Sequence, residues 1–139
     1  MIKTLTALFI MVSLIEAKGL NSAMQEYMKG LETEVKKEDP NFKGFDYTRG
    51  ESIFTSEHIG KKNKLVSCVT CHSKNLSSNG LNVNTNKVIE PLSPLANPQR
   101  FTDVKEVKKW LRRNFRDVYN RVGTAQEKGD VITYIINKK

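Results

Sequence analysis

The 139-residue chain contains few of the side chains that crosslink a fold or bind a metal. It has two cysteines, Cys68 and Cys71, two histidines, and no methionine after residue 28. Two cysteines cannot supply the disulfide framework of a small secreted scaffold. The chain has no internal repeat, and its apolar run at residues 5–15 is too short to span a bilayer. These absences argue against a disulfide-stapled scaffold and a repeat protein.

Residues 1–17 have the pattern of a secretory signal peptide. Lys3 gives a basic start, the apolar run follows, and Ile15 and Ala17 occupy suitable −3 and −1 positions for cleavage. We therefore expect export to the periplasm and one mature domain at residues 18–139. The alternative is that the segment is retained as a membrane anchor.

The cysteines are part of the pentad Cys68-Val69-Thr70-Cys71-His72, the C-x-x-C-H pattern of covalent haem attachment. Its two thiols can form thioether bonds to one edge of the porphyrin, and the adjacent imidazole can bind the iron as proximal ligand. The pattern predicts one haem c, held by Cys68 and Cys71 and ligated by His72.

Other interpretations of the pentad fit less well. Zinc needs four ligands, and outside the pentad only His58 remains among the cysteines and histidines. A thioredoxin-like pair needs a βαβ context, which the sequence lacks. A disulfide between cysteines three positions apart would be strained and would close almost no loop.

The chain is strongly basic, with a formal net charge of +8. Its lysine and arginine pairs are scattered, and an exported haem protein meets little nucleic acid, so we expect no nucleic-acid partner. A positive face suits docking to another redox protein with an acidic surface, either a cytochrome or a membrane redox complex. A merely solvated basic surface is the alternative.

Hydrophobic periodicity predicts an all-α fold of about four helices, small and cytochrome c-like, with a proline-rich loop wrapped around the haem. The expected helices cover residues 20–37, a segment that Thr48 and Glu51 begin as a capping box, residues 104–120 after Thr102-Asp103, and residues 125–137. Residues 57–67 and 73–86 have no helical period. Pro91, Pro94 and Pro98 exclude a regular helix from the loop that follows.

The residues alone leave the iron ligand opposite His72 open. Ordinary monohaem cytochromes c use a downstream methionine, which this chain does not have. Met24 and Met28 have the spacing of a helix core, and His58 follows a helix beside a basic loop. Asn114 ends the apolar stripe of Val104, Val107 and Leu111, where a buried amide needs a polar partner or a metal.

Several motifs resemble the sphaeroides haem protein (SHP) family of small monohaem cytochromes c. They are Asn97-Pro98-Gln99-Arg100-Phe101-Thr102-Asp103, Lys109-Trp110-Leu111-Arg112-Arg113-Asn114, Thr124-Ala125-Gln126-Glu127-Lys128-Gly129-Asp130, Lys87-Val88-Ile89-Glu90-Pro91-Leu92-Ser93-Pro94, and Arg49-Gly50-Glu51 with Phe54. The resemblance covers about residues 24–137. It implies that Asn114 is the distal iron ligand, and that the ferrous form loses this bond and binds O₂ or NO.

The sequence departs from the family prototype at one place. The prototype has a disulfide beside its ligating asparagine, whereas this chain has Phe115 and Gly123 at the two matching positions. Control of ligand release by such a bridge therefore cannot operate here.

The remaining candidates surround the expected haem. We expect the backbone carbonyl of Pro91 or Pro94 to accept a hydrogen bond from the second nitrogen of His72. Trp110 should pack on the macrocycle or in the core, and Arg112, Arg113 or Lys87 should pair with haem propionates or remain solvated.

A neutral amide is a weak iron ligand that suits ferric iron better than ferrous iron. The sequence thus favours an exported cytochrome that transfers electrons and opens a gas site on reduction. A plain electron shuttle without gas chemistry and a gas-reducing haem enzyme are the alternatives. An electron carrier fits better than a turnover enzyme, because one haem supplies one electron at a time.

Overall fold

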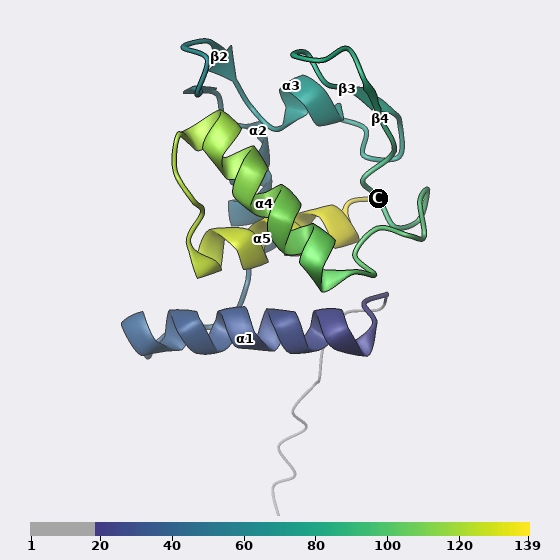
Figure 1. Cartoon of the computed structure of the whole chain (residues 1–139). Helices are drawn as coiled ribbons and strands as arrows, with labels where there is room; N and C mark the ends of the chain where they lie inside the picture. Colours follow the sequence, from purple (N-terminus) through teal and green to yellow (C-terminus); the bar gives the residue numbers. More distant parts are fainter. Residues whose placement is uncertain (1–18) are drawn as a thin grey trace, which may run out of the picture.

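The computed structural model describes residues 19–139, which form five helices and two short hairpins (Figure 1). In chain order the elements are α1 (Ser22–Glu38), α2 (Tyr47–Thr55), β1 (His58–Ile59), β2 (Leu65–Val66), α3 (Val69–His72), β3 (Gly80–Leu81), β4 (Val88–Ile89), α4 (Val104–Tyr119) and α5 (Ala125–Asn137). The mostly helical architecture predicted from the sequence is confirmed. The predicted signal peptide, residues 1–17, lies outside the described residues.

Helix α1 forms the lower layer of the molecule in Figure 1 and packs mainly against α5. Asn21 begins it, because its side-chain oxygen accepts a hydrogen bond from the backbone N–H of Met24 at 2.9 Å. Met24, Leu31 and Val35 are buried on one face, as their spacing predicted.

Helices α2 and α5 form the most extensive helix–helix contact among the described residues. Gly50 makes this approach possible, because a Cβ at this position would collide with the backbone carbonyl of Asp130. The Asp130 carboxylate is buried and accepts hydrogen bonds from Nε and Nη2 of Arg49, at 2.8 and 2.9 Å. The ion pair between Arg49 and Asp130 therefore fixes the start of α2 on α5.

The prediction that Thr48 begins α2 with a capping box was wrong. The cap is Asp46, whose side chain accepts a hydrogen bond from the backbone N–H of Arg49 at 2.7 Å. The capping box occurs instead in α5. There the Thr124 hydroxyl accepts from the Glu127 N–H at 3.1 Å, and the Glu127 carboxylate accepts from the Thr124 N–H at 2.8 Å.

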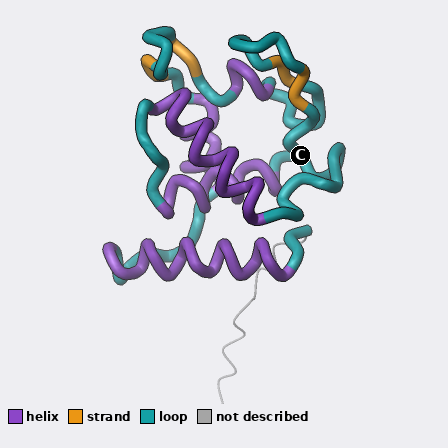
Figure 2. Tube along the Cα trace, in the orientation of Figure 1, coloured by secondary structure: helices purple, strands orange, loops and turns teal. Residues whose placement is uncertain are grey.

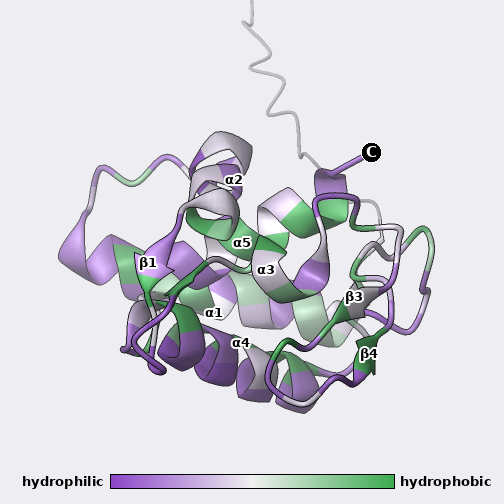
Figure 3. Cartoon of the chain, turned by 90° about the horizontal axis from the view of Figure 1, so that it is seen from above, coloured by the Kyte–Doolittle hydropathy of each residue, from purple (hydrophilic) through white to green (hydrophobic). Residues whose placement is uncertain are grey.

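Helix α4 crosses in front of α5 in Figure 1. Asp103 caps it by accepting from the N–H groups of Lys105 and Glu106, and Asn120 ends it in a left-handed conformation. Leu111, Phe115 and Val118 are its buried residues. Figure 3 shows hydrophilic residues along its outer side.

Two hairpins of two-residue strands stand above the helices, with α3 between them (Figure 2). His58 pairs with Val66 in the first, and Gly80 pairs with Ile89 in the second. The sequence did not predict them, because strands this short show no alternation of apolar and polar residues.

The buried core joins α1, α2, α4 and α5, and includes Met24, Leu31, Phe54, Leu76, Leu111, Phe115, Val131, Ile132, Tyr134 and Ile135. Over residues 19–139, none of the helices has the length and hydropathy needed to cross a membrane.

Candidate functional site

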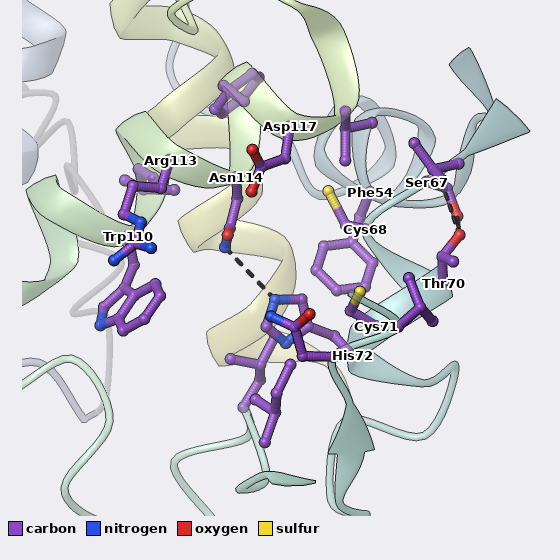
Figure 4. Close-up of a pocket in the computed structure, with 18 of the residues that line it drawn as sticks. Phe54, Ser67, Cys68, Thr70, Cys71, His72, Trp110, Arg113, Asn114 and Asp117 are labelled. Atoms are coloured by element: carbon purple, nitrogen blue, oxygen red, sulfur yellow. Dashed lines mark hydrogen bonds between the residues drawn. The ribbon is translucent and has the colours of Figure 1, made fainter. Parts of the chain in front are cut away.

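A cavity of about 1160 Å³ opens between α3, α4 and the two hairpins (Figure 4). Val131 and Ile135 of α5 and Phe54 of α2 belong to its apolar lining. The predicted residues Cys68, Cys71, His72, Trp110 and Asn114 all line it, and these come from two segments far apart in the sequence. The cavity is large enough for a macrocyclic cofactor.

The pentad folds into a single helical turn, which places both thiols and the imidazole on the cavity wall (Figure 4). The His72 N–H donates to the Cys68 carbonyl at 3.0 Å, and the Thr70 hydroxyl accepts from the Ser67 N–H at 2.9 Å. Ser73 then ends the turn with a φ of 69°. The turn presents the side chains that covalent haem attachment requires.

The hairpin β3–β4 is fixed against this turn by a glycine. A Cβ on Gly80 would collide with the carbonyl oxygen of Cys71. Only a residue without a side chain allows the strand to approach the pentad so closely.

Asn114 on α4 and His72 on α3 meet inside the cavity, although they lie 42 positions apart in the chain (Figure 4). Their side-chain nitrogens, Nδ2 and Nε2, lie 3.4 Å apart. The Asn114 amide could bind a metal only through its carbonyl oxygen, because this atom carries the lone pairs.

The His72 imidazole is in the protonation state that iron ligation needs. Burial, and secondarily the positive charge of Arg100, lowers its pKa to about 4, so the ring is neutral at physiological pH. Its Nδ1 atom is buried and has no hydrogen-bond partner. The Phe54 ring lies beside it, with 6.2 Å between the ring centroids.

The thiol of Cys68 is also shielded by the protein. Burial, reinforced by the neighbouring Cys71, raises its pKa to about 12. A protonated thiol is a poor nucleophile, which does not suit thiol–disulfide exchange chemistry. The two thiols are free of each other and of any third cysteine, as thioether attachment requires.

Pro91 and Pro94 do not line the cavity, and neither carbonyl accepts a hydrogen bond from His72. The Pro91 carbonyl instead accepts from Nε of Arg100 at 2.8 Å, and the Glu90 carbonyl accepts from Nη2 of the same guanidinium at 2.8 Å. The expected partnership of His72 with a proline carbonyl is therefore absent from this structure.

Arg100 is a cavity residue that the sequence did not single out. It is half-buried, its guanidinium is held by two backbone carbonyls, and it has no carboxylate partner among the ion pairs of residues 19–139. In the sequence, the only indication of its role was its place in the segment 97–103, one of the motifs that resemble the SHP family. Of the three cations expected beside the haem, Arg113 and Lys87 line the cavity and Arg112 does not.

Trp110 stands at the rim of the cavity and does not pack in the core, since 45% of its surface is exposed. Its indole N–H donates to Glu106 at 3.2 Å, and the Arg113 guanidinium lies 5.0 Å from the ring centroid. These contacts fix the indole at the rim of the cavity that Asn114 also lines.

The other candidate iron ligands lie elsewhere. His58 stacks on Tyr119 with 4.1 Å between ring centroids, and neither His58, Met24 nor Met28 lines the cavity. Within residues 19–139, no group of three or more histidine, cysteine or acidic side chains could hold a bare metal ion. The donor set therefore fits a haem, which brings four nitrogen ligands of its own, and does not fit a metal site made of protein alone.

Comparisons with known proteins agree with this chemistry. A family model described as a domain of unknown function, DUF1924, matches residues 40–135. The chain is 41% identical over 90 residues to the cytochrome c-type protein SHP of Cereibacter sphaeroides, covering 65% of this chain and 69% of the relative. It is 28% identical over 100 residues to cytochrome c'' of Methylophilus methylotrophus, covering 72% and 69%.

Solved structures share the fold. Oxidised SHP, described as an oxygen binding cytochrome c, superposes with a TM-score of 0.72 at 34% identity, covering 83% of this chain and 96% of the other. Oxidised cytochrome c'' of Methylophilus methylotrophus superposes with a TM-score of 0.74 at 24% identity, covering 84% and 94%. With the pentad on the wall of a haem-sized cavity, these matches show that the chain belongs to the SHP-like family of small monohaem c-type cytochromes and carries one covalent haem c.

Proposed function

We propose that this cytochrome transfers single electrons in the periplasm, and that Asn114 is a distal iron ligand which detaches on reduction to leave a site for a diatomic gas such as O₂ or NO. The observation that carries the proposal is the position of Asn114, whose side-chain amide meets the His72 imidazole inside the cavity. Within residues 19–139, the cavity lining contains no methionine and no second histidine that could compete for this role.

When bound, the haem would be held by Cys68, Cys71 and His72 and would supply a one-electron redox centre. His72 is anchored in the pentad turn, next to the two attachment cysteines, and should stay in place in both oxidation states. Asn114 offers only a neutral carbonyl dipole. Its attraction to iron falls when an electron reduces the charge of the metal, so the amide is the ligand that should leave.

The relatives support this assignment. The solved SHP structure is described as that of an oxygen binding cytochrome c, and a solution structure of cytochrome c'' is described in terms of haem-ligand detachment. The cavity offers a place for a released amide to turn away, because Asn114 is only half-buried and lies near the exposed side chains of Trp110 and Arg113. The basic charge of the chain supports a redox partner with an acidic surface, such as another cytochrome or a membrane redox complex.

Absorption and electron paramagnetic resonance spectra of the purified holoprotein test the proposal. We expect a low-spin ferric form, and a ferrous form that is high-spin and shifts its Soret band under CO. In Asn114→Ala the ferric form should become high-spin. Arg112→Ala, a change on the same helix outside the cavity, should leave the ferric spectrum unchanged.

A ferrous protein that stays low-spin and inert to CO would reject ligand release and leave a plain electron shuttle. An unchanged ferric spectrum in Asn114→Ala would reject Asn114 as the ligand. Sustained gas consumption with a reductant would show a turnover enzyme in place of a carrier.

A further inference from the structure

The outer side of α4 carries a stripe of positive charge. Its members recur at steps of three and four residues, which places them on one face of the helix: Lys105, Lys108, Arg112 and Arg116. All four are exposed, and none takes part in an ion pair formed within residues 19–139. At a rise of about 1.5 Å per residue the stripe runs for about 16 Å along the helix. Figure 3 shows this side of α4 as hydrophilic.

The stripe lies on the side of α4 that faces away from the haem cavity. None of its four residues lines the cavity, whereas Val107, Trp110 and Asn114 of the same helix do. A haem bound in the cavity therefore leaves the stripe exposed to solvent.

The acidic residues of this helix lie on its other side. Asp103, which caps α4, and Glu106 and Asp117 within it all line the cavity. Glu106 is paired with Lys109 at 3.1 Å. Positive and negative charges are thus segregated across α4, and the outer side carries positive charge without a carboxylate partner.

The stripe has no apolar centre. The one large hydrophobic residue of α4 that is exposed is Trp110, at the rim of the cavity. Protein interfaces have a well-packed core that is enriched in aromatic residues and poor in lysine. A row of lysines and arginines without such a core is instead the pattern that attracts a membrane surface, where anionic headgroups can arrange themselves around each charge.

The first described residues of the chain lie at the amino-terminal end of the stripe. The Asn21 amide donates to the carbonyl of Thr102, immediately before α4, at 2.8 Å. The sequence predicts that residues 1–17, which lie outside the described residues, are a signal peptide or a retained membrane anchor. The segment that meets the membrane during export thus joins the domain beside the stripe.

We propose that Lys105, Lys108, Arg112 and Arg116 form a peripheral membrane-binding face that holds the cytochrome on anionic phospholipids such as phosphatidylglycerol. This inference rests on the export that the proposed function includes, and it adds a surface on which the exported protein works. Binding is electrostatic and reversible, since the stripe has no apolar side chain to insert into the bilayer. Because Asn114 projects from the other side of the helix, the haem cavity lies on the side of α4 away from the lipid.

Co-sedimentation of the ferric holoprotein, purified from the periplasmic fraction, with lipid vesicles tests this face. At low ionic strength the parent should bind vesicles that contain about one third phosphatidylglycerol, and about 0.5 M salt should release it. Vesicles of neutral phosphatidylcholine should not bind it. In Lys105→Glu/Arg112→Glu the partition coefficient on anionic vesicles should fall by more than about tenfold.

The matched control is Lys29→Glu/Lys37→Glu, which makes the same charge change at exposed positions of α1 and should keep most of the binding. The ferric Soret spectrum should be the same in the parent and in both variants, since none of the four substituted residues lines the cavity. If charge reversal unfolds the stripe variant, Lys105→Gln/Arg112→Gln removes the two charges without reversing them and should show a smaller loss of binding.

Three outcomes would overturn the proposal. An equal loss of binding in the two charge-reversal variants would show a response to net charge alone. A parent protein that does not bind anionic vesicles at low ionic strength would show that the stripe is only a solvated surface. A stripe variant that binds vesicles like the parent, but reacts more slowly with an acidic redox protein, would assign the stripe to a protein partner.

Membrane binding and ligand release are measured independently. The CO spectrum of the ferrous protein in solution tests the proposed release of Asn114 and needs no vesicles. Vesicle binding of the ferric protein needs no ligand release, so the failure of one proposal is distinguishable from the failure of the other.

Discussion

The ring of Phe115 lies directly against the backbone of Gly123. A Cβ on Gly123 would approach three ring carbons of Phe115 within 2.7–2.8 Å, which is closer than such atoms pack. Gly123 is buried in the connection between α4 and α5, and Phe115 directly follows Asn114. Packing thus joins the residue after Asn114 to the connection between α4 and α5.

Gly123→Ala should lower the stability of the fold and shift the part of α4 that carries Asn114. The added methyl group forces the Phe115 ring to move, and overpacking of this kind costs about 1–3 kcal/mol. Because the displaced ring belongs to the residue after Asn114, we also expect a larger high-spin fraction in the ferric protein. Denaturant unfolding and electron paramagnetic resonance measure the two effects.

Gly30→Ala provides the matched control. Gly30 is exposed within α1, and a Cβ there meets no atom within 4 Å. This substitution should stabilise the helix by about 0.5–1 kcal/mol and leave the ferric spectrum unchanged. Equal effects of the two substitutions would contradict a specific role for the Phe115–Gly123 contact.

The buried carboxylate of Asp130 should be more important for stability than any surface ion pair. It is 1% exposed and bonds to Arg49 and to the backbone N–H of Asp46. Asp130→Asn should cost about 3 kcal/mol, at the low end for breaking a buried pair, because the Arg49 side chain keeps some contact with water. Chemical denaturation gives this value.

The comparison is Lys138→Ala, which removes the pair with Glu51 at the end of α5. Both of its partners are solvent-accessible, so this loss should lower stability far less than Asp130→Asn does. A similar cost for the two variants would show that Asp130 acts only as a surface charge.

Glu127 should give the fold a pH-dependent contribution. Its hydrogen bond with Arg121, and then its bond to Thr124, hold the pKa of this carboxyl below its usual value of 4.5. The stabilisation is therefore complete above the unfolded-state pKa of 4.5 and disappears as the pH falls through the lower pKa of the folded state.

Glu127→Gln should lower stability at pH 7 by less than about 1 kcal/mol, because it removes the charge paired with Arg121 while the amide oxygen can still accept from the Thr124 N–H. As the pH falls through the lowered pKa of the folded state, the variant and the parent should converge, because the parent carboxyl becomes protonated. Thermal unfolding at several pH values tests this, and a difference that grows toward low pH would contradict it.

Arg100→Gln should lower the reduction potential of the haem. A fixed positive charge in the cavity favours the ferrous state, and removing about 1 kcal/mol of this charge–charge energy corresponds to roughly 40 mV for one electron. Arg112→Gln removes a charge outside the cavity and should shift the potential by less than about 10 mV. Equal shifts in a redox titration would remove Arg100 from the set of haem-facing residues.

The sequence predicted the parts of the fold whose signals are local. The helical periods gave the buried faces of α1 and α5, and Asp103 capped α4 as expected. The cap of α2 was misplaced, because Asp46 and Thr48 are both good caps and only the contact with Asp130 selects between them.

The cavity could be predicted only in part. The pentad identified the cofactor because its spacing carries the chemistry by itself. Arg100 was missed because its position depends on how the irregular loop around Pro91 folds back, which no periodic pattern encodes. The two glycines that hold the hairpins, Gly60 and Gly80, resemble ordinary loop glycines until their backbone neighbours are known.

His72 and Asn114 lie 42 positions apart, so binding of both side chains to one iron would crosslink the chain. With both side chains on one metal, residues 73–113 form a closed ring, and a ring of this size restricts the unfolded chain by about 4 kcal/mol in the chain-entropy model. The proposed detachment of the amide would open this ring. Reduction would then remove a crosslink that spans residues 73–113, and amide hydrogen exchange along this segment should be faster in the ferrous protein than in the ferric one.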